Sequence, residues 1–282
     1  SPAIHRGAAP GGQQMLVHFG IRKTGSSSIQ ETLFRAPDGA LGDTRYLSYG
    51  IANSSLMVRN LFVAPDSHSR MVHGVLRTRF DIGLRRIASS PRAIFSAETI
   101  SDLDAAGAEK LMAALSARGA QLSFIGYLRD PVTYLRSAFQ EQLKNAYGRG
   151  FPFGPGGVPR RNYHQIVDRL DALAGPDRVK VFPFDRALFP QGDVVRHFLD
   201  QAGIDPDRLT IRRVNESLSM TAVKALFAYR RLRAPRDTDL GSDTTRDVCV
   251  TLLSRLDGPA FNLSPAIDTR IARRNVHILD WS

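Results

Sequence analysis

A lysine, a glycine and three consecutive serines lie between an apolar stretch and an amphipathic one near the start of the chain. The segment, HFGIRKTGSSSIQ, covers residues 18–30. Gly25 lets the backbone turn tightly, and the N–H groups that open a helix attract a phosphate. We therefore expect Ser26, Ser27 and Ser28 to bind a phosphate through their N–H groups and hydroxyls, with Lys23 adding a positive charge. The alternative left open is a plain serine cap on a helix.

This loop differs from the ATP-binding Walker A loop in the order of its residues. A Walker A loop places its lysine directly after the last glycine and a Ser or Thr beside that lysine to hold magnesium. Here Lys23 precedes Gly25, and no clear apolar strand downstream ends in the aspartate of a Walker B element. We therefore expect phosphate binding without a metal.

A second candidate group lies in FIGYLRDPVTYLRSAFQEQ, where a buried strand is expected to end at Leu128. Arg129 follows it, Pro131 suits the first turn of a helix, and Ser137 lies two helical turns further on. A guanidinium binds phosphate with two parallel hydrogen bonds, so Arg129 and Ser137 suit a second phosphate. A local pairing of Arg129 with Asp130 is the open alternative.

Glu98, in AIFSAETIS, is the third candidate because it directly follows an expected strand. Burial in its mostly apolar surroundings would raise its pKa and make it a proton acceptor. The alternative is a glutamate that caps a helix.

The elements expected to position these groups alternate between short apolar runs and longer amphipathic stretches. The predicted strands are residues 14–19, 92–97, 121–128 and 178–184, with a weaker one in TRYLSYG at 44–50. The predicted helices are residues 26–34, 67–89, 103–118, 131–146, 163–173, 193–202 and 217–232. This alternation predicts an α/β fold with a mostly parallel sheet covered on both faces, whose ligands bind beyond the carboxyl ends of the strands.

The composition is that of a globular protein: of 282 residues, 43% are hydrophobic and 23% are charged. We expect a disordered tail at residues 1–13 and one domain over 14–282, mainly helical from about 217 onward. The Gly- and Pro-rich residues 147–162 suggest a mobile flap.

Cys249 is the single cysteine, so it forms no intramolecular disulfide, and we expect it to be buried. With no apolar run long enough to span a membrane and no signal-peptide core, we expect a cytoplasmic protein.

The chain is basic, with 38 Lys and Arg against 27 Asp and Glu and a formal charge of +11. The basic residues are scattered and lack the aromatic side chains that alternate with them in single-strand binders. The charge therefore favours an anionic ligand and solvated faces over nucleic acid.

Together, HFGIRKTGSSSIQ and YLRDPVTYLRSAF resemble sulfotransferases that use 3'-phosphoadenosine 5'-phosphosulfate (PAPS), in particular their bacterial carbohydrate-type branch. The spacing from Arg129 to Ser137 is that of the family. VFPFDRALFPQGDVVRHFLDQAGID and VNESLS are similar to later segments of it, so the resemblance extends over about residues 14–219. It implies a P-loop NTPase-like sulfotransferase fold of three layers.

The resemblance also implies a mechanism in which a sulfuryl group is transferred from PAPS to a hydroxyl, without a metal. Glu98 would be the base, Lys23 would stabilise the leaving phosphate, and the acceptor would be a sugar or glycoconjugate such as a glycan or glycolipid. The residues implied for binding PAPS are Arg22, Lys23, Thr24, Gly25, Ser26, Ser27, Ser28, Arg129 and Ser137.

The chain departs from the family pattern after Arg129. The arginine that relatives often carry five residues later is Tyr134 here, with Arg136 nearby; Arg212 and Arg213 are other possible sources of that charge. His68 and His73 are alternative bases, as in the cytosolic branch. Two other functions stay open, a P-loop kinase or other phosphotransferase and a non-catalytic binder of nucleotides or polyanions.

Overall fold

The computed structural model describes residues 12–21, 23–63, 69–145, 163–214, 217–232 and 248–274. Arg22, His68, most of the predicted tail and the predicted flap at 147–162 lie outside the described residues. The chain divides into two compact units, the first formed by Ser1–Arg129 and Tyr163–Val214, the second by Asp130–Asn162 and Asn215–Ser282. Each unit is described by itself.

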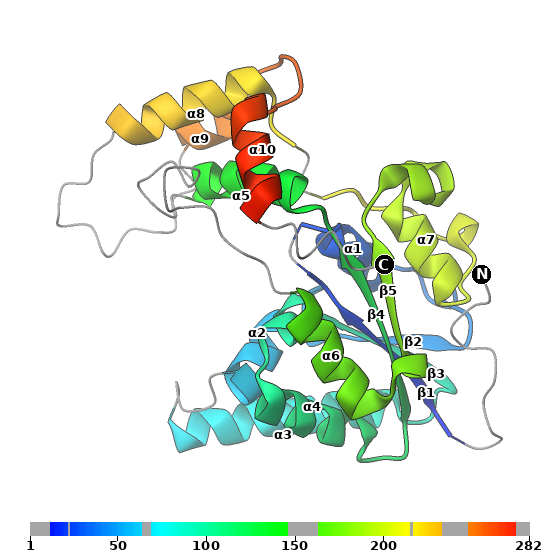
Figure 1. Cartoon of the computed structure of the whole chain (residues 1–282). Coiled ribbons are helices and arrows are strands. Elements are labelled where there is room, and N and C mark those ends of the chain that lie inside the picture. The colour runs from blue at the N-terminus through cyan, green and yellow to red at the C-terminus, as the bar shows by residue number, and fades with distance from the viewer. Residues whose placement is uncertain are drawn as a thin grey trace. The chain divides into compact units, whose positions relative to one another are not determined.

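The first unit is built on a five-stranded sheet in the order β2-β3-β1-β4-β5 (Figure 1). All four neighbouring pairs are parallel, which confirms the predicted α/β fold with a mostly parallel sheet. The central strands are almost wholly buried because helices cover both faces of the sheet. The strands are β1 (Gln14–Phe19), β2 (Thr44–Leu47), β3 (Arg92–Ala97), β4 (Gln121–Leu128) and β5 (Val179–Pro183).

The helices of the first unit begin and end within a few residues of the predicted bounds. They are α1 (Ser26–Phe34), α3 (Arg70–Ile87), α4 (Ala105–Ser116), α6 (Tyr163–Ala174) and α7 (Val194–Gln201). The sequence patterns missed α2 (Ser55–Val58), the π-helical turn Arg59–Val63 and several 3-10 turns. Such short elements lack the repeated apolar spacing that identifies a longer helix.

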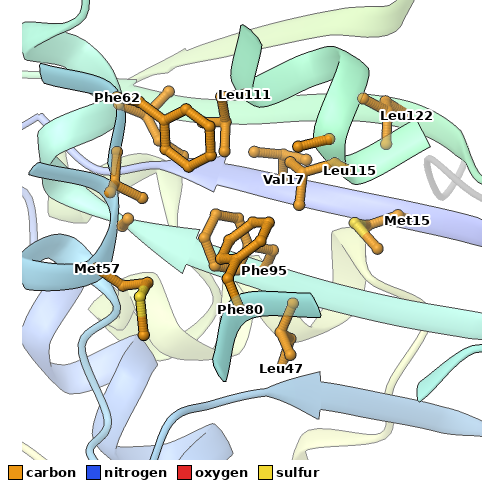
Figure 2. Close-up of a cluster of buried hydrophobic side chains, with 14 of the residues drawn as sticks. Met15, Val17, Leu47, Met57, Phe62, Phe80, Phe95, Leu111, Leu115 and Leu122 are labelled. Atoms are coloured by element: carbon orange, nitrogen blue, oxygen red, sulfur yellow. The ribbon is translucent and has the colours of Figure 1, made fainter. Parts of the chain in front are cut away.

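Alternate residues of β1 face opposite sides of the sheet, and each side has its own apolar core. Val17 packs in one cluster with Phe80 of α3 and Leu111 of α4, as Figure 2 shows. Leu16 packs in the other with Ile29 of α1 and Phe198 of α7. Full burial of each such side chain contributes about 1.5–3 kcal/mol. These two cores hold the carboxyl ends of β1, β3 and β4 in fixed positions.

The second unit is helical in its described part. It contains α5 (Pro131–Asn145), α8 (Met220–Leu232), α9 (Val248–Leu253) and α10 (Pro265–Arg274), which share one apolar cluster. Arg136 of α5 forms an ion pair with Asp268 of α10, and its guanidinium also donates to Asn262 Oδ1 at 2.9 Å. Arg136 is therefore already bonded to acceptors within its own unit.

The prediction that Cys249 is buried is wrong, because its side chain is exposed on α9. Helical spacing turns Val250 and Leu253 toward the apolar cluster of the second unit. Cys249 lies in the first turn of this short helix, at the margin of that face, and its side chain stays exposed.

Within the described part of the chain, no helix combines the length and the apolar character that crossing a membrane requires.

Candidate active site

The loop after β1 turns into α1 through Gly25, which has a left-handed backbone conformation with φ of 79°. A Cβ atom at this position would lie 2.6 Å from Cγ1 of Val194 on α7. Both the backbone angle and the neighbouring helix therefore require glycine here. Lys23 is also left-handed, with φ of 71°, so the loop follows a tight path on either side of Thr24.

The first turn of α1 presents donors that the helix does not satisfy internally. Gly25 is the residue before the helix and has no side chain that could accept from the first N–H groups. The hydroxyl of Ser26 is buried and has no hydrogen-bond partner among the described residues. A buried polar atom without a partner is costly, and a phosphate oxygen at this helix terminus would satisfy it. The loop therefore fits the phosphate predicted from the sequence.

Two other hydroxyls of the loop make bonds within the protein. Thr24 is fully buried, and its Oγ1 donates to the carbonyl oxygen of Ile21 at 2.5 Å. Ser28 Oγ accepts from the N–H of Val214 at 3.0 Å. The Thr24 side chain therefore shapes the loop, whereas Ser28 keeps its own O–H as a donor.

Glu98 lies beside this loop. It begins a 3-10 turn (Glu98–Asp102) directly after β3, and its N–H donates to Ser55 Oγ at 2.8 Å. A Cβ atom built on Gly20, at the end of β1, would lie 2.4 Å from Ser26 Oγ and 3.0 Å from Glu98 Cγ. Gly20, Ser26 and Glu98 therefore pack closely together at the carboxyl ends of β1 and β3, where a side chain at position 20 would not fit.

Arg129 also reaches the loop. Its Nη1 donates to the carbonyl oxygen of Lys23 at 2.6 Å, and its guanidinium lies 5.2 Å from the ring centroid of Phe184. The Arg129 carbonyl accepts from the Tyr163 hydroxyl at 3.0 Å. Arg129 thus connects the end of β4 to the lysine of the loop, a contact that the sequence motif alone did not indicate.

The remaining predicted site residues stay predictions. Ser137 lies on α5 in the second unit, and Arg22 is outside the described residues. Of the alternative bases, His73 lies on α3 and His68 is not described. Asp130 accepts from the N–H of Thr133 at 2.9 Å and so caps α5.

The segment around Arg212 packs along α1 through hydrogen bonds that the sequence did not reveal. The N–H of Arg212 donates to Thr32 Oγ1 at 2.9 Å, one helical turn beyond Ser28. The Arg213 side chain pairs with Asp193 at 3.2 Å. Arg213 therefore has an acidic partner already, whereas the Arg212 side chain is exposed beside the helix that follows the loop.

A buried polar cluster lies in the sheet before the loop. His18 Nδ1 is 2.8 Å from Ser96 Oγ, and Gln30 Nε2 donates to the same hydroxyl at 3.0 Å. Complete burial lowers the pKa of His18 from 6.5 to about 3, so its ring is neutral at pH 7. The cluster connects β1, β3 and α1. Its signal in the sequence was a histidine and a serine at matching places in two otherwise apolar strands.

Among the described residues, no three or more His, Cys, Asp or Glu side chains are grouped in a way that could hold a metal ion.

No protein-family model and no curated protein matches the sequence. Among solved structures, the fold is similar to a sulfotransferase from Alicyclobacillus acidocaldarius, with 16% identity over 79% of this chain and 95% of that one and a TM-score of 0.47. It is also similar to the tunicamycin resistance protein of Deinococcus radiodurans, with 17% identity over 70% of this chain and 98% of that one and a TM-score of 0.38.

Proposed function

We propose that this protein transfers the sulfuryl group of PAPS to a hydroxyl of an acceptor, with Glu98 as the base. The observation that carries the proposal is the close packing of two side chains against Gly20. One is the Ser26 hydroxyl, which has no partner among the described residues, and the other is the Glu98 side chain. A phosphate-binding donor and a proton acceptor thus lie next to each other, as in-line transfer from a phosphate-bound group requires.

In the proposed reaction, Glu98 takes the proton of the acceptor hydroxyl and the acceptor oxygen forms a bond to sulfur. The bond between sulfur and the bridging oxygen breaks, and the electron pair leaves on the 5'-phosphate of adenosine 3',5'-bisphosphate. Lys23 and the N–H groups of Ser26 and Ser27 stabilise the negative charge that develops there. The products are the sulfated acceptor, the bisphosphate and a protonated Glu98.

Arg129 has a double role in this proposal. Its hydrogen bond to the Lys23 carbonyl supports the loop. A guanidinium carries five N–H donors, so the same side chain can also bond to the 3'-phosphate. Ser137 would complete that second phosphate site, as the sequence motif implies.

Thermal stabilisation by ligands tests the class of function. We expect adenosine 3',5'-bisphosphate to raise the melting temperature in the presence of EDTA, because ligands that bind only the native state stabilise it. Stabilisation by Mg-ATP and not by the bisphosphate would instead identify a phosphotransferase. Stabilisation by a sulfated polymer alone would identify a non-catalytic polyanion binder.

Replacing Glu98 by Gln tests the base. A glutamine side chain would keep the shape of the site but could not accept a proton, so Glu98→Gln should lower turnover of PAPS at least about 100-fold. Affinity for the bisphosphate, measured by calorimetry, should stay unchanged. Glu109→Gln, at an exposed position on α4, is the matched control and should turn over normally. Normal turnover by Glu98→Gln would show that Glu98 is structural.

A further inference from the structure

A groove of about 720 Å³ lies between one face of α3 and the segment that follows β2. The α3 residues that line it recur at helical spacing from Met71 to Arg86, which extends over about 22 Å at 1.5 Å per residue. Ser48, Tyr49 and Gly50 form the opposite wall. The groove is therefore a long channel along one helix, within the first unit.

Three large apolar side chains of the groove lining are exposed. Met71 is 78% exposed and Val75 63% exposed, and both line the groove. Ile82, the third, is 39% exposed and lies on the same face of α3. A concentration of this kind is typical of a binding surface rather than of a solvated one.

Two glycines of α3 give the groove its shape. A Cβ atom at Gly83 would lie 2.6 Å from Cε1 of Tyr49, so glycine is required there for the wall to approach the helix. Gly74 has nothing within 4 Å of its Cβ direction, although glycine inside a helix is unfavourable. The absent side chain at Gly74 leaves the groove open near its Met71 end.

The groove also has a charge preference. Its described lining residues include Arg79 and Arg86 and no carboxylate. Arg79 Nη2 donates to the Tyr49 carbonyl at 2.6 Å, which holds this guanidinium at the wall. An occupant with both an apolar chain and an anionic group would complement the two features.

The wall of the groove continues toward Glu98. Leu47, the last residue of β2, pairs with Phe95 of β3, so the groove wall begins beside the end of the strand that leads to Glu98. Further along the same segment, Ser55 Oγ accepts from the Glu98 N–H at 2.8 Å. The segment that forms the groove wall therefore also contacts the backbone of the proposed base.

We propose that this groove binds the apolar chain of an anionic amphiphile, and that this amphiphile is the hydroxyl-bearing acceptor. The second half of the statement rests on the proposed sulfuryl transfer, whereas binding of the amphiphile does not. The apolar chain lies against Met71, Val75 and Ile82, and its anionic group pairs with Arg86.

Calorimetric titration with octyl phosphate and dodecyl phosphate, kept below their micelle concentrations, measures this binding directly. Affinity should rise with chain length by up to about fourfold per methylene group, as expected for burial of a hydrocarbon chain. Inorganic phosphate, which the proposed phosphate-binding loop would also bind, should have the same affinity for the wild-type protein and for the Gly74→Leu variant described below. Equal affinity for the two chain lengths, or none for either, would overturn the proposal.

Gly74→Leu places a side chain in the part of the groove nearest Met71, and its Cβ meets no atom within 4 Å. It should leave the melting temperature unchanged or higher, because leucine favours the helix, and should weaken dodecyl phosphate binding at least tenfold. Val75→Asp should likewise weaken dodecyl phosphate binding at least tenfold. Val72→Asp is the matched control, an exposed apolar residue of the same helix outside the groove, and should bind normally. Equal loss in the Val72 variant would overturn the assignment to the groove.

Arg86→Gln tests the anionic preference. It should weaken the binding of dodecyl phosphate but leave the binding of the neutral dodecyl maltoside unchanged. Equal loss of affinity for both ligands would show that Arg86 does not recognise the anionic group. Co-sedimentation with anionic phospholipid vesicles separates a single ligand from a membrane surface. Binding to vesicles without binding of monomeric dodecyl phosphate would overturn the proposal in favour of membrane docking.

Adenosine 3',5'-bisphosphate affinity, measured on the same groove variants, should not change. If the wild-type protein fails to bind the bisphosphate but binds dodecyl phosphate, the proposed function is overturned and the groove assignment stands. The reverse result would overturn the groove assignment alone.

Discussion

The loop at residues 20–28, which we expect to bind phosphate, and the α3 groove lie in the same unit. They differ in how completely the protein's own side chains fill them. In the loop, Gly25 abuts Val194, Thr24 is bonded to Ile21, and the Lys23 carbonyl accepts from Arg129. In the groove, Gly74 faces open space and Met71 is 78% exposed. The loop is thus preorganised by the fold, whereas the groove is left open to a ligand.

The proposed sulfuryl transfer would use both features. Charge stabilisation needs fixed donors, because groups that must reorganise during the reaction stabilise it less. An apolar chain is recognised mainly through buried area, which has no preferred direction and tolerates a looser surface. The predictions below test this contrast, beginning with the largest expected effect.

Lys23→Ala should show how much of the loop's charge is functional. We expect kcat for sulfuryl transfer to fall about 100- to 1,000-fold, or roughly 2.7–4 kcal/mol, as when one preorganised charge-stabilising group is removed. Steady-state kinetics with PAPS measures the change, and Lys110→Ala, at an exposed position on α4, is the control. A kcat within a few-fold of wild type would exclude this role for Lys23.

Gly25→Ala should show that the loop has no free space. The left-handed angle and the 2.6 Å approach of Val194 together should cost about 2–4 kcal/mol of unfolding free energy, measured in urea. Val194→Ala in the same chain should recover part of the loss, because the contact is removed while the backbone strain stays. Additive effects of the two substitutions would show that the steric contact is unimportant.

Arg129→Ala should separate support of the loop from recognition of the second phosphate. We expect adenosine 3',5'-bisphosphate to bind about 1.5–3 kcal/mol more weakly, through loss of charge-assisted hydrogen bonds. Adenosine 5'-phosphate, which lacks the 3'-phosphate, should lose much less affinity in calorimetry. Equal losses for the two nucleotides would mean that Arg129 acts only by holding the Lys23 carbonyl.

The buried His18 cluster should make stability fall in weakly acidic solution. The unfolded chain protonates histidine near pH 6.5, whereas the folded His18 has a pKa of about 3, so the unfolded state binds more protons between these values. Lowering the pH from 7 to 5 should cost about 2 kcal/mol of unfolding free energy. Burial lowers the pKa of His197 in the same direction, so His18→Asn should reduce this slope without abolishing it. An unchanged slope in the Asn variant would contradict the burial of a neutral His18.

Gly74→Ala should have the smallest effect of these substitutions, and it should stabilise the protein rather than destabilise it. Alanine favours the helix over glycine, and the added Cβ meets no atom within 4 Å, so stability should rise by about 0.5–1 kcal/mol. Gly83→Ala, on the same helix, is the matched comparison and should destabilise, because its Cβ would approach Tyr49 to 2.6 Å. Destabilisation by both substitutions would show that the groove is closed at Gly74.

Much of the fold could be predicted from periodicity, because long amphipathic helices and buried parallel strands have strong apolar patterns. The prediction of β1 and α1 was correct to the residue. The weak prediction at residues 44–50 corresponds to the short edge strand β2. The prediction for Cys249 was wrong because tertiary contacts, rather than composition, decide which residues of a six-residue helix are buried.

The sequence by itself determined the α/β class, the strands after which Glu98 and Arg129 lie, and a lysine-containing loop without the Walker order. These features are local in the chain, and local patterns report them. The strand order, the approach of Glu98 to Ser26 across Gly20, and the bond from Arg129 to the Lys23 carbonyl were decided only by the tertiary structure. They depend on which strands lie side by side and on where a glycine lets other side chains pack closely, and neither is encoded in the spacing of residues along one segment.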